Sequence, residues 1–300
     1  MSNALAVKQT AMGINDSELI LNPDGSIYHL HLKPENIGPT IITVGDPGRV
    51  SAVSKHFDTI DYKQHKREFK THTGVLKNKR ISVVSTGIGS DNIDIVLNEL
   101  DALVNIDFKS RKTKANLTSL NIIRIGTSGA IQADIPVDTF LLSSHGLDIN
   151  GMLQCYRIDT IRNKEFEAEF CKHSRWGNKR AQPILVQNSK AIENKLMSDG
   201  VLKGITATCA GFYAPQGRAL RLKPQDIDFI YKLQSFVYKG YKITNFEMET
   251  SALYGLSKLL GHQACSISAI LANRSNGSFS KTAETTMDKL IQYTLEKLTN

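Results

Sequence analysis

Short apolar runs alternate with helical patterns along most of this chain. Ile41–Val44 and Ile81–Thr86 have the length and composition of strands. The segment 91–104, which follows the second of them, places its apolar residues on one helical face. Ala264–Asn273 is apolar almost throughout, as expected of a strand that is buried on both faces. This alternation predicts an α/β fold, a single domain with a central mixed sheet flanked by helices.

No internal repeat or low-complexity linker divides the 300 residues, so we expect one domain from 27 to 300. Residues 1–26 lack the basic and then apolar pattern of a signal peptide, and we expect a flexible or draped arm there. The segment 151–182 is expected to be a polar excursion. No apolar run is long enough to span a bilayer, and no two of the four cysteines have the spacing of a zinc site. The sequence therefore predicts a cytoplasmic protein with reduced cysteines.

The formal net charge of +8 raises the question of an anionic partner. The basic residues are dispersed, and the densest runs are 63–70 and 109–114. The second run has no interleaved aromatic residues, and we expect a solvated loop there. We therefore expect small anionic substrates, and neither nucleic acid nor a membrane, as partners.

The ends of the predicted strands carry residues that suit an anion. Gly45 follows the first strand, and Pro47 then opens a helix whose N–H groups can face a negative charge. Arg49 can bind two oxygens of a phosphate at once. Taken alone, this stretch is equally compatible with a plain surface turn.

Two more glycine-containing loops are expected at strand ends. The loop after the second strand does not complete a dinucleotide-binding motif, because Asn92 stands where the last glycine would be. The loop after the third strand carries Arg124, Thr127 and Ser128. Ala130 breaks the pattern of a serine-hydrolase elbow, so we expect a cradle for an oxyanion there and no nucleophile. The lysine signature of a triphosphate loop is absent, and the three loops together favour a single inorganic phosphate.

The loop after the fourth strand could recognise a flat heterocycle. Gln216 offers both a donor and an acceptor, and Arg218 offers donors only. Phe212 could stack on the face of a ring. The alternative is a polar loop that covers a core aromatic residue.

Two carboxylates follow at a predicted helix entrance, Glu247 and Glu249. Residues two positions apart point in different directions there, so we do not expect a catalytic carboxylate pair. One carboxylate could hold a diol, and structural salt bridges are the alternative.

Seven segments resemble, in order, the signatures of uridine phosphorylases in the nucleoside phosphorylase-I superfamily. They are VGDPGRV, KREF, STGIG, RIGTSGAIQ, FYAPQGR, NFEMET and ILANRS. The resemblance extends from about residue 27 to the C-terminus and implies a nucleoside phosphorylase fold. It also implies a pentosyltransferase that converts uridine and phosphate reversibly into uracil and ribose 1-phosphate. Phosphate is then a co-substrate, and no cofactor is expected.

The same resemblance implies roles for individual residues. Phosphate would be bound by Gly45, Arg49, Arg124 and Thr127, and Arg67 would reach the phosphate of a neighbouring subunit. Ribose would be bound by Ser128, Met248, Glu249 and, across the subunit interface, His29. Uracil would be bound by Phe212, Gln216 and Arg218, with Arg274 supporting Arg218 or the pocket wall. The residues expected to carry catalysis are Arg49, Arg124, Gln216 and Arg218.

Sharing of the site across an interface implies a homo-oligomer, either a dimer or a hexamer built from dimers. Glu68 and Asn92 match positions that help to bind potassium between subunits in some relatives. Asn92 replaces a serine there, which leaves potassium at Glu68 undecided.

Purine-handling relatives carry a Ser-Asp pair at the end of the last core strand, and this chain has Asn273 and Arg274. This difference favours a pyrimidine base. A purine nucleoside phosphorylase or a nucleosidase of the same fold is the alternative, although a nucleosidase has no need of phosphate-binding arginines. A catalytically silent nucleoside- or nucleic-acid-binding protein is the alternative from another class.

Overall fold

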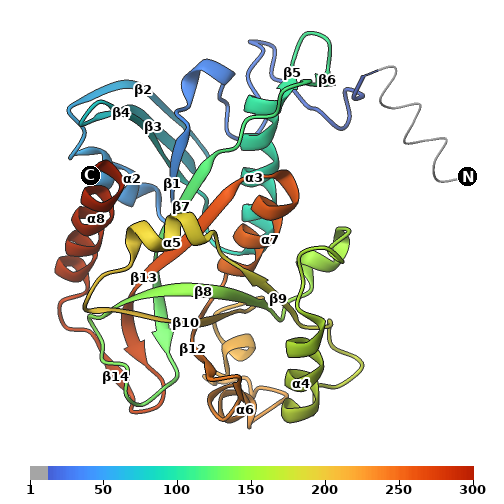
Figure 1. Cartoon of the computed structure of the whole chain (residues 1–300), viewed down its shortest axis with the longest axis vertical. Helices are drawn as coiled ribbons and strands as arrows, with labels where there is room; N and C mark the ends of the chain where they lie inside the picture. Colours follow the sequence, from blue (N-terminus) through green and yellow to red (C-terminus); the bar gives the residue numbers. More distant parts are fainter. Residues whose placement is uncertain (1–12) are drawn as a thin grey trace, which may run out of the picture.

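The computed structural model describes residues 13–300. Across these residues, one mixed sheet of twelve strands is flanked by seven α-helices (Figure 1). The predicted fold class is therefore confirmed. Part of the predicted arm, residues 1–12, lies outside the described residues. Between residues 13 and 300, no helix has the length and apolar character needed to cross a membrane.

The strands are β1 (Thr40–Val44), β2 (Thr59–Lys66), β3 (Phe69–Leu76), β4 (Lys79–Ser85), β5 (Ile106–Asp107), β6 (Lys112–Thr113), β7 (Asn121–Ala130), β8 (Phe140–Asp148), β9 (Ile184–Gln187), β10 (Val201–Thr208), β11 (Val237–Tyr238), β12 (Tyr241–Glu247), β13 (Gln263–Asn273) and β14 (Ser278–Phe279). The helices are α2 (Pro47–Ser54), α3 (Ser90–Asn105), α4 (Lys164–Ser174), α5 (Lys190–Leu196), α6 (Phe229–Gln234), α7 (Thr250–Leu260) and α8 (Ala283–Thr299). Three short 3-10 helices are Pro34–Asn36, Met152–Cys155 and Ala214–Gln216.

The strand order places the ends of distant segments next to one another. The main path is β11-β12-β10-β8-β13-β7-β1-β4-β3-β2, and β12 also pairs with β7, so five strands close into a ring. β1 runs parallel to both β4 and β7, with Thr43 opposite Val84 on one side and Arg124 on the other. β12 meets the far end of β7, where Phe246 pairs with Gly129. The loops after β1, β4 and β12 therefore all open beside β7.

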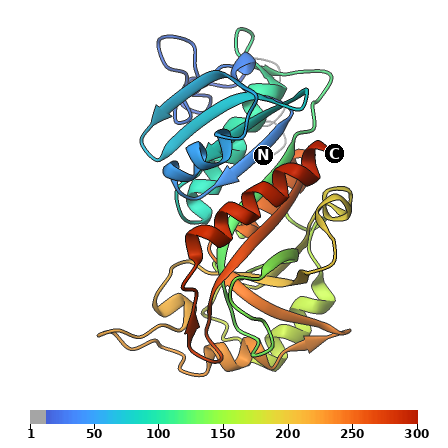
Figure 2. The same ribbon diagram turned by 90° about the vertical axis from the view of Figure 1, so that its left-hand side faces the viewer.

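Helices cover the sheet on two faces. Consecutive strand residues belong to different apolar clusters: Ile41 lies in the cluster with α3 and α7, and Ile42 lies in the cluster with α2, α5 and α8. This is the alternation expected of strands with both faces buried. In Figure 2, α8 runs across its face of the sheet between the two ends of the molecule.

The basic run at 109–114 has a different role from the one predicted. It lies in and beside the β5–β6 hairpin, and Arg111 donates to the backbone oxygens of Ile14 (2.6 Å), Asn15 (2.9 Å) and Leu19. Leu19, which belongs to this N-terminal arm, is buried in the apolar core. Residues 13–26 are thus draped over the body of the protein, and Arg111 binds them.

Two strands were not predicted, and two local predictions differ from the structure. β2 and β3 were not predicted. For β2 the reason is that it is an edge strand with a largely exposed, polar sequence and no apolar alternation. The glycine loop expected at the end of the strand, from Gly126 on, is part of β7, which continues to Ala130. The polar excursion at 151–182 contains α4, which buries Phe166 and Phe170.

Candidate active site

One cavity of about 850 Å³ opens where β1, β4, β10 and β12 end beside β7 and β13. It is lined by Gly45, Asp46, Pro47, Arg49, Glu68, Gly87, Ile88, Asn92, Arg124, Thr127, Ser128, Gly129, Phe212, Gln216, Arg218, Phe246, Glu247, Met248, Glu249, Leu271, Ala272 and Phe279. The structure therefore brings together all the predicted site residues except His29, Arg67 and Arg274. Its position at strand ends is typical of ligand sites in α/β proteins.

The GDPGR stretch forms a turn and the start of a helix at one end of this cavity. Asp46 is the N-cap of α2, and its carboxylate accepts from the Gly48 amide at 2.7 Å. Gly48 therefore shapes the helix start. A side chain at Gly45 would meet only the Gly87 backbone oxygen, at 3.5 Å, which leaves the cavity side open to a ligand.

Two guanidinium groups at this end lack a full set of partners. Arg124 is 6% exposed, and its Nη2 pairs with Glu249 and, at 3.5 Å, with Glu247. Its Nη1 is buried without a hydrogen-bond partner. Within residues 13–300, Arg49 has neither a hydrogen bond nor an ion pair at its side chain. Burial and then the charge of Arg124 lower the pKa of Arg49. An anion bound here would relieve this repulsion and satisfy the free N–H groups.

Burial would by itself lower the pKa of Arg124, but Glu249 and then Glu247 outweigh it and raise that pKa. Both carboxylates therefore converge on one guanidinium. The prediction that they point in different directions was wrong, because Glu247 ends a strand and Glu249 follows it in a tight turn before α7.

Glycine at position 126 makes room for Arg124. A Cβ atom at Gly126 would lie 1.9 Å from Arg124 Nη1. This glycine has no positive φ within the strand, so its role is close packing and not an unusual backbone conformation.

We expect Gly126→Ala to displace the Arg124 guanidinium while the strand is retained, because the clash falls on the end of a flexible side chain. Binding of inorganic phosphate should weaken by about 10²-fold, the scale on which a misplaced site group acts. Gly177→Ala, at a glycine with no neighbouring atom within 4 Å, is the matched control. Titration calorimetry on both variants checks this, and wild-type phosphate affinity in Gly126→Ala would contradict it.

The middle of the cavity carries Glu249, Met248 and Ser128. Glu249 accepts from the Gly89 amide at 2.9 Å, and Ser90 Oγ donates to the Met248 oxygen at 3.0 Å. Ser128 Oγ donates to the Phe246 oxygen at 3.1 Å and accepts from Asn245 Nδ2 at 2.6 Å. Its single proton is thus engaged. Ser128 can therefore accept a hydrogen bond from a ligand in this arrangement.

The far end of the cavity offers hydrogen-bond donors beside aromatic rings. Arg218 lies over the Phe212 ring at 3.7 Å and donates to Gln216 Oε1 at 2.5 Å. Because Oε1 is engaged, the amide Nε2 of Gln216 remains as a donor. Burial and then Arg274 lower the pKa of Arg218 to about 10. Arg274 lies behind the cavity wall and donates to the backbone oxygens of Gln216 (3.3 Å) and Gly217 (3.4 Å).

His29 and Arg67 lie away from the cavity of their own chain. His29 Nδ1 is 2.7 Å from a Glu99 oxygen on α3. Arg67 is exposed at the β2–β3 turn, with φ of 56°. Glu68, in the same turn, does line the cavity near Asn92 and Gly87.

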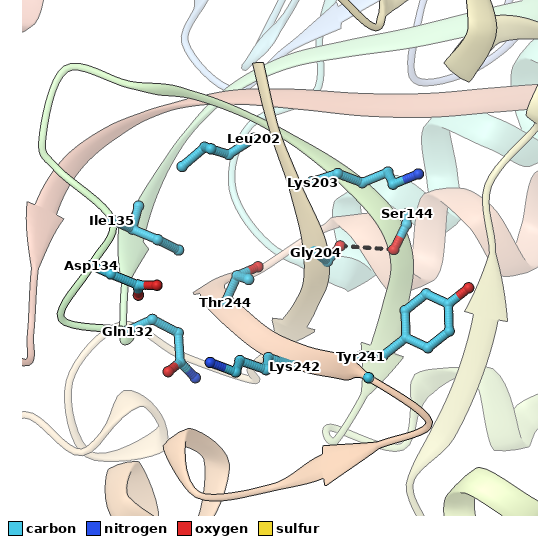
Figure 3. A pocket seen from close by; sticks show the side chains of 11 residues that line it. Gln132, Asp134, Ile135, Ser144, Leu202, Lys203, Gly204, Tyr241, Lys242 and Thr244 are labelled. Atoms are coloured by element: carbon cyan, nitrogen blue, oxygen red, sulfur yellow. Dashed lines mark hydrogen bonds between the residues drawn. The ribbon is translucent and has the colours of Figure 1, made fainter. Parts of the chain in front are cut away.

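A second, smaller cavity of about 400 Å³ is formed by the start of β10, the start of β12 and the connection after β7 (Figure 3). Lys203, Lys242, Gln132 and Asp134 lie around it, and Ser144 Oγ donates to the Gly204 oxygen at 3.0 Å. None of the predicted site residues lines it. The large cavity is therefore the candidate active site.

Comparisons with known proteins agree with this geometry. Residues 39–297 match the family described as the phosphorylase superfamily. A uridine phosphorylase of Thermococcus kodakarensis is 29% identical over 262 residues, which are 87% of this chain and 82% of that protein. A DeoD-type purine nucleoside phosphorylase of Buchnera aphidicola is 25% identical, over 91% of this chain and 99% of that protein.

A solved structure of a Trypanosoma brucei nucleoside phosphorylase, described as showing uridine phosphorylase activity, has a TM-score of 0.85 and 28% identity. The alignment covers 94% of this chain and 99% of that one. The chain belongs to the phosphorylase superfamily, and the predicted resemblance is confirmed.

Sequence reasoning missed one lining residue with clear contacts, Phe246, and did not place Glu247 among the site residues. Phe246 packs within 5.6 Å of the Arg218 guanidinium and 5.9 Å of that of Arg274. Its signal was its place directly before Glu247, but the strand that ends there was not predicted, and a helix was expected to begin at Glu247. The error hid the convergence of both carboxylates on Arg124.

Proposed function

We propose that this protein is a uridine phosphorylase, which converts uridine and phosphate reversibly into uracil and ribose 1-phosphate. One observation carries the proposal. A single cavity has partly unpaired guanidiniums, those of Arg49 and Arg124, at one end and the donors of Gln216 and Arg218 at the other. The relatives named uridine phosphorylase support it.

In this proposal, phosphate binds to Arg49 and Arg124, with Gly45 and Thr127 beside it. Cleavage of the N-glycosidic bond develops positive charge on the sugar and negative charge on the base. Phosphate stabilises the first and then bonds to the anomeric carbon. Glu249, Met248 and Ser128 hold the ribose, so that the reacting atoms are aligned.

The base end acts on the leaving group. Gln216 and Arg218 donate to the uracil oxygens as charge flows into the ring, and Phe212 stacks on it. The carboxylates that line the cavity are Asp46, Glu68, Glu247 and Glu249, and among the described residues none of them contacts Gln216 or Arg218. Within residues 13–300, no lining carboxylate is thus placed at the base end to protonate a purine ring, which favours a pyrimidine over the alternative of a purine nucleoside phosphorylase.

A phosphate-dependence assay on the purified protein tests the proposal. Uridine, thymidine, inosine and adenosine are incubated with and without inorganic phosphate, and the released base is measured. We expect uracil release from uridine only when phosphate is present. Faster cleavage of inosine would favour the purine enzyme, and phosphate-independent cleavage would favour a nucleosidase. Salt-dependent RNA binding without cleavage would favour a silent binding protein.

The proposal includes no metal or organic cofactor. Among residues 13–300, no group of three His, Cys, Asp or Glu side chains could hold a metal ion. Asn92 Nδ2 donates to the Ile88 oxygen at 3.3 Å, so an amide nitrogen already occupies the vicinity of Glu68. These residues fit a potassium ion poorly. The cysteines are all free, in agreement with a cytoplasmic enzyme.

We further propose a homo-oligomer in which Arg67 and His29 complete the site of a neighbouring subunit. Because Arg67 is exposed and lies outside its own cavity, an isolated subunit should lack one phosphate contact. We expect Arg67→Ala to remain folded and to lose phosphate affinity by about tenfold or more. Sedimentation combined with activity assays checks this, and fully active monomers would contradict it.

A further inference from the structure

A chain of hydrogen-bonded side chains crosses the closed ring of strands and ends at the large cavity. Asn245 lies at its centre, on β12, and is 0% exposed. Its Oδ1 accepts from Thr206 Oγ1 and Thr244 Oγ1, both at 2.9 Å, and its Nδ2 donates to Ser128 Oγ at 2.6 Å. The hydroxyl of Ser143 on β8 extends the chain, 2.6 Å from Thr206 Oγ1. Of these five residues, Ser128 alone lines the large cavity.

These polar side chains lie where an apolar core would be expected. Thr206 and Ser143 are also 0% exposed. A buried hydroxyl or amide without a partner typically costs about 1–3 kcal/mol, so such a network is stable only when its members satisfy one another. The network therefore fixes the orientation of each member, Ser128 included.

The proton of Ser128 is engaged within the protein, because Oγ donates to the Phe246 oxygen at 3.1 Å. Turning the Asn245 amide by 180° would direct this proton to Oδ1 instead. In either orientation, a ligand meets only a lone pair of Ser128. A lone pair can accept from a sugar hydroxyl, but it does not bind an ionised phosphate oxygen.

We propose that Asn245 is a positioning residue, which through Ser128 places a hydrogen-bond acceptor for a ribose hydroxyl in the middle of the cavity. The bond to Asn245 holds the Ser128 oxygen, and the remaining lone pair serves the ligand. Without that bond, the Ser128 hydroxyl is free to rotate. The inference rests on the proposed function for the identity of the sugar, and it assigns Asn245 no contact with substrate.

The test is a double-mutant cycle of Asn245→Leu and Ser128→Ala in the full chain. The binding of uridine and of inorganic phosphate is measured separately by titration calorimetry. Asn245→Leu alone should weaken uridine binding by about tenfold, the scale of one well-placed hydrogen bond. In the Ser128→Ala background, the same change should alter uridine binding by less than about twofold, because both substitutions act through one hydroxyl. Phosphate binding should not weaken.

Coupling between the two substitutions separates this role from a structural one. Independent losses in the cycle, or phosphate binding that weakens as much as uridine binding, would overturn the inference. Asn105→Leu is the matched control, since Asn105 is a buried, hydrogen-bonded amide outside the cavity and should leave uridine binding unchanged.

A milder variant decides the question if urea unfolding shows that Asn245→Leu does not fold. Thr206→Val keeps the shape of the side chain and removes one of the two hydroxyls that bind Asn245 Oδ1. It then replaces Asn245→Leu in the cycle. Uridine binding should weaken by about threefold when Ser128 is present and stay unchanged in Ser128→Ala. Equal losses in both backgrounds would overturn the inference.

Deoxynucleosides identify the sugar hydroxyl that donates to Ser128. The binding of 2′-, 3′- and 5′-deoxyuridine is compared between the wild type and Asn245→Leu, or Thr206→Val in its place. The analogue that lacks the donating hydroxyl should bind both proteins equally, and the other two should lose affinity in the variant as uridine does. A loss with all three analogues would overturn the assignment of a sugar hydroxyl as the donor.

Uridine binding and turnover by the wild type keep the inference apart from the proposed function. If the wild type converts uridine and the two substitutions act independently, the inference alone is rejected. If the wild type binds inosine and not uridine, the function alone is rejected, and the cycle is run with inosine, which has the same ribose. A wild type that binds neither nucleoside would overturn both.

Discussion

Replacing Arg49 by methionine is expected to abolish most phosphorolysis of uridine while leaving the fold at least as stable as in the wild type. Arg49 is a guanidinium without a hydrogen bond or ion pair in the described part of the chain, and burial and Arg124 lower its pKa. In the free protein its charge is therefore less favourable than it would be in water. Methionine keeps the packing of the aliphatic stem and removes the charge.

The same charge is what a phosphate needs. Loss of one preorganised donor typically costs about 10²–10³-fold in rate, and a charged, bidentate donor falls at the upper end of that range. The Michaelis constant for phosphate should rise more than that for uridine, because Arg49 lies at the phosphate end of the cavity.

Steady-state kinetics with both substrates varied, together with thermal unfolding, checks the Arg49 prediction. Arg157→Met, at an exposed arginine, is the matched control. A large drop in melting temperature in parallel with the activity loss would show that Arg49 is structural. An unchanged Michaelis constant for phosphate and an unchanged rate would show that Arg49 does not take part in phosphate binding.

The strand ends explain why so much of the site could be predicted from the sequence. Gly45, Arg124 and Gln216 follow or lie in strands whose apolar character is plain, and parallel strands bring their ends together. The fold class rests on the same periodicity. The α/β alternation, and with it the predicted fold class, does not depend on the exact boundaries of individual strands.

The incorrect predictions have a common physical origin. They depend on how side chains and strands pack in the folded protein, which the spacing of residues in the sequence does not show. Gly126 was expected at the end of a strand, before a glycine loop, but it lies inside β7, where its missing side chain makes room for Arg124. β2 shows no apolar alternation because it lies at the sheet edge. Glu247 and Glu249 converge on Arg124 only because a strand turns into a helix between them. Side-chain direction at such a turn depends on tertiary structure and not on sequence separation.

Arg218→Ala is expected to lower phosphorolysis by about 10²–10³-fold and to change stability little. The structure gives reasons for both parts. Arg218 is one of two side chains at the base end that can donate to a uracil oxygen, and its guanidinium already lies over the Phe212 ring at 3.7 Å. Without it, negative charge on the departing base is met by Gln216 alone.

The small stability effect follows from the electrostatics of the same side chain. Burial and Arg274 lower the pKa of Arg218, so its charge is partly uncompensated in the free protein. Truncation removes that repulsion as well as the hydrogen bonds to the Phe212 oxygen and to Gln216. The loss of repulsion raises the stability and the loss of hydrogen bonds lowers it, so the two changes oppose each other. Their effects on the rate of phosphorolysis do not oppose each other.

The outcome of the Arg218 experiment depends on comparing rate with stability in one pair of variants. Arg221→Ala changes an exposed arginine three positions further along the same loop and should leave both quantities at wild-type values. Uracil release and urea unfolding are measured for both. An Arg218→Ala protein with full activity would contradict the proposed role of Arg218 in binding the base. Equal losses of activity and stability would show that Arg218 has a structural role in its loop. A rate loss without a stability loss would show that Arg218 acts on the leaving base, at the end of the cavity opposite the proposed phosphate-binding residues Arg49 and Arg124.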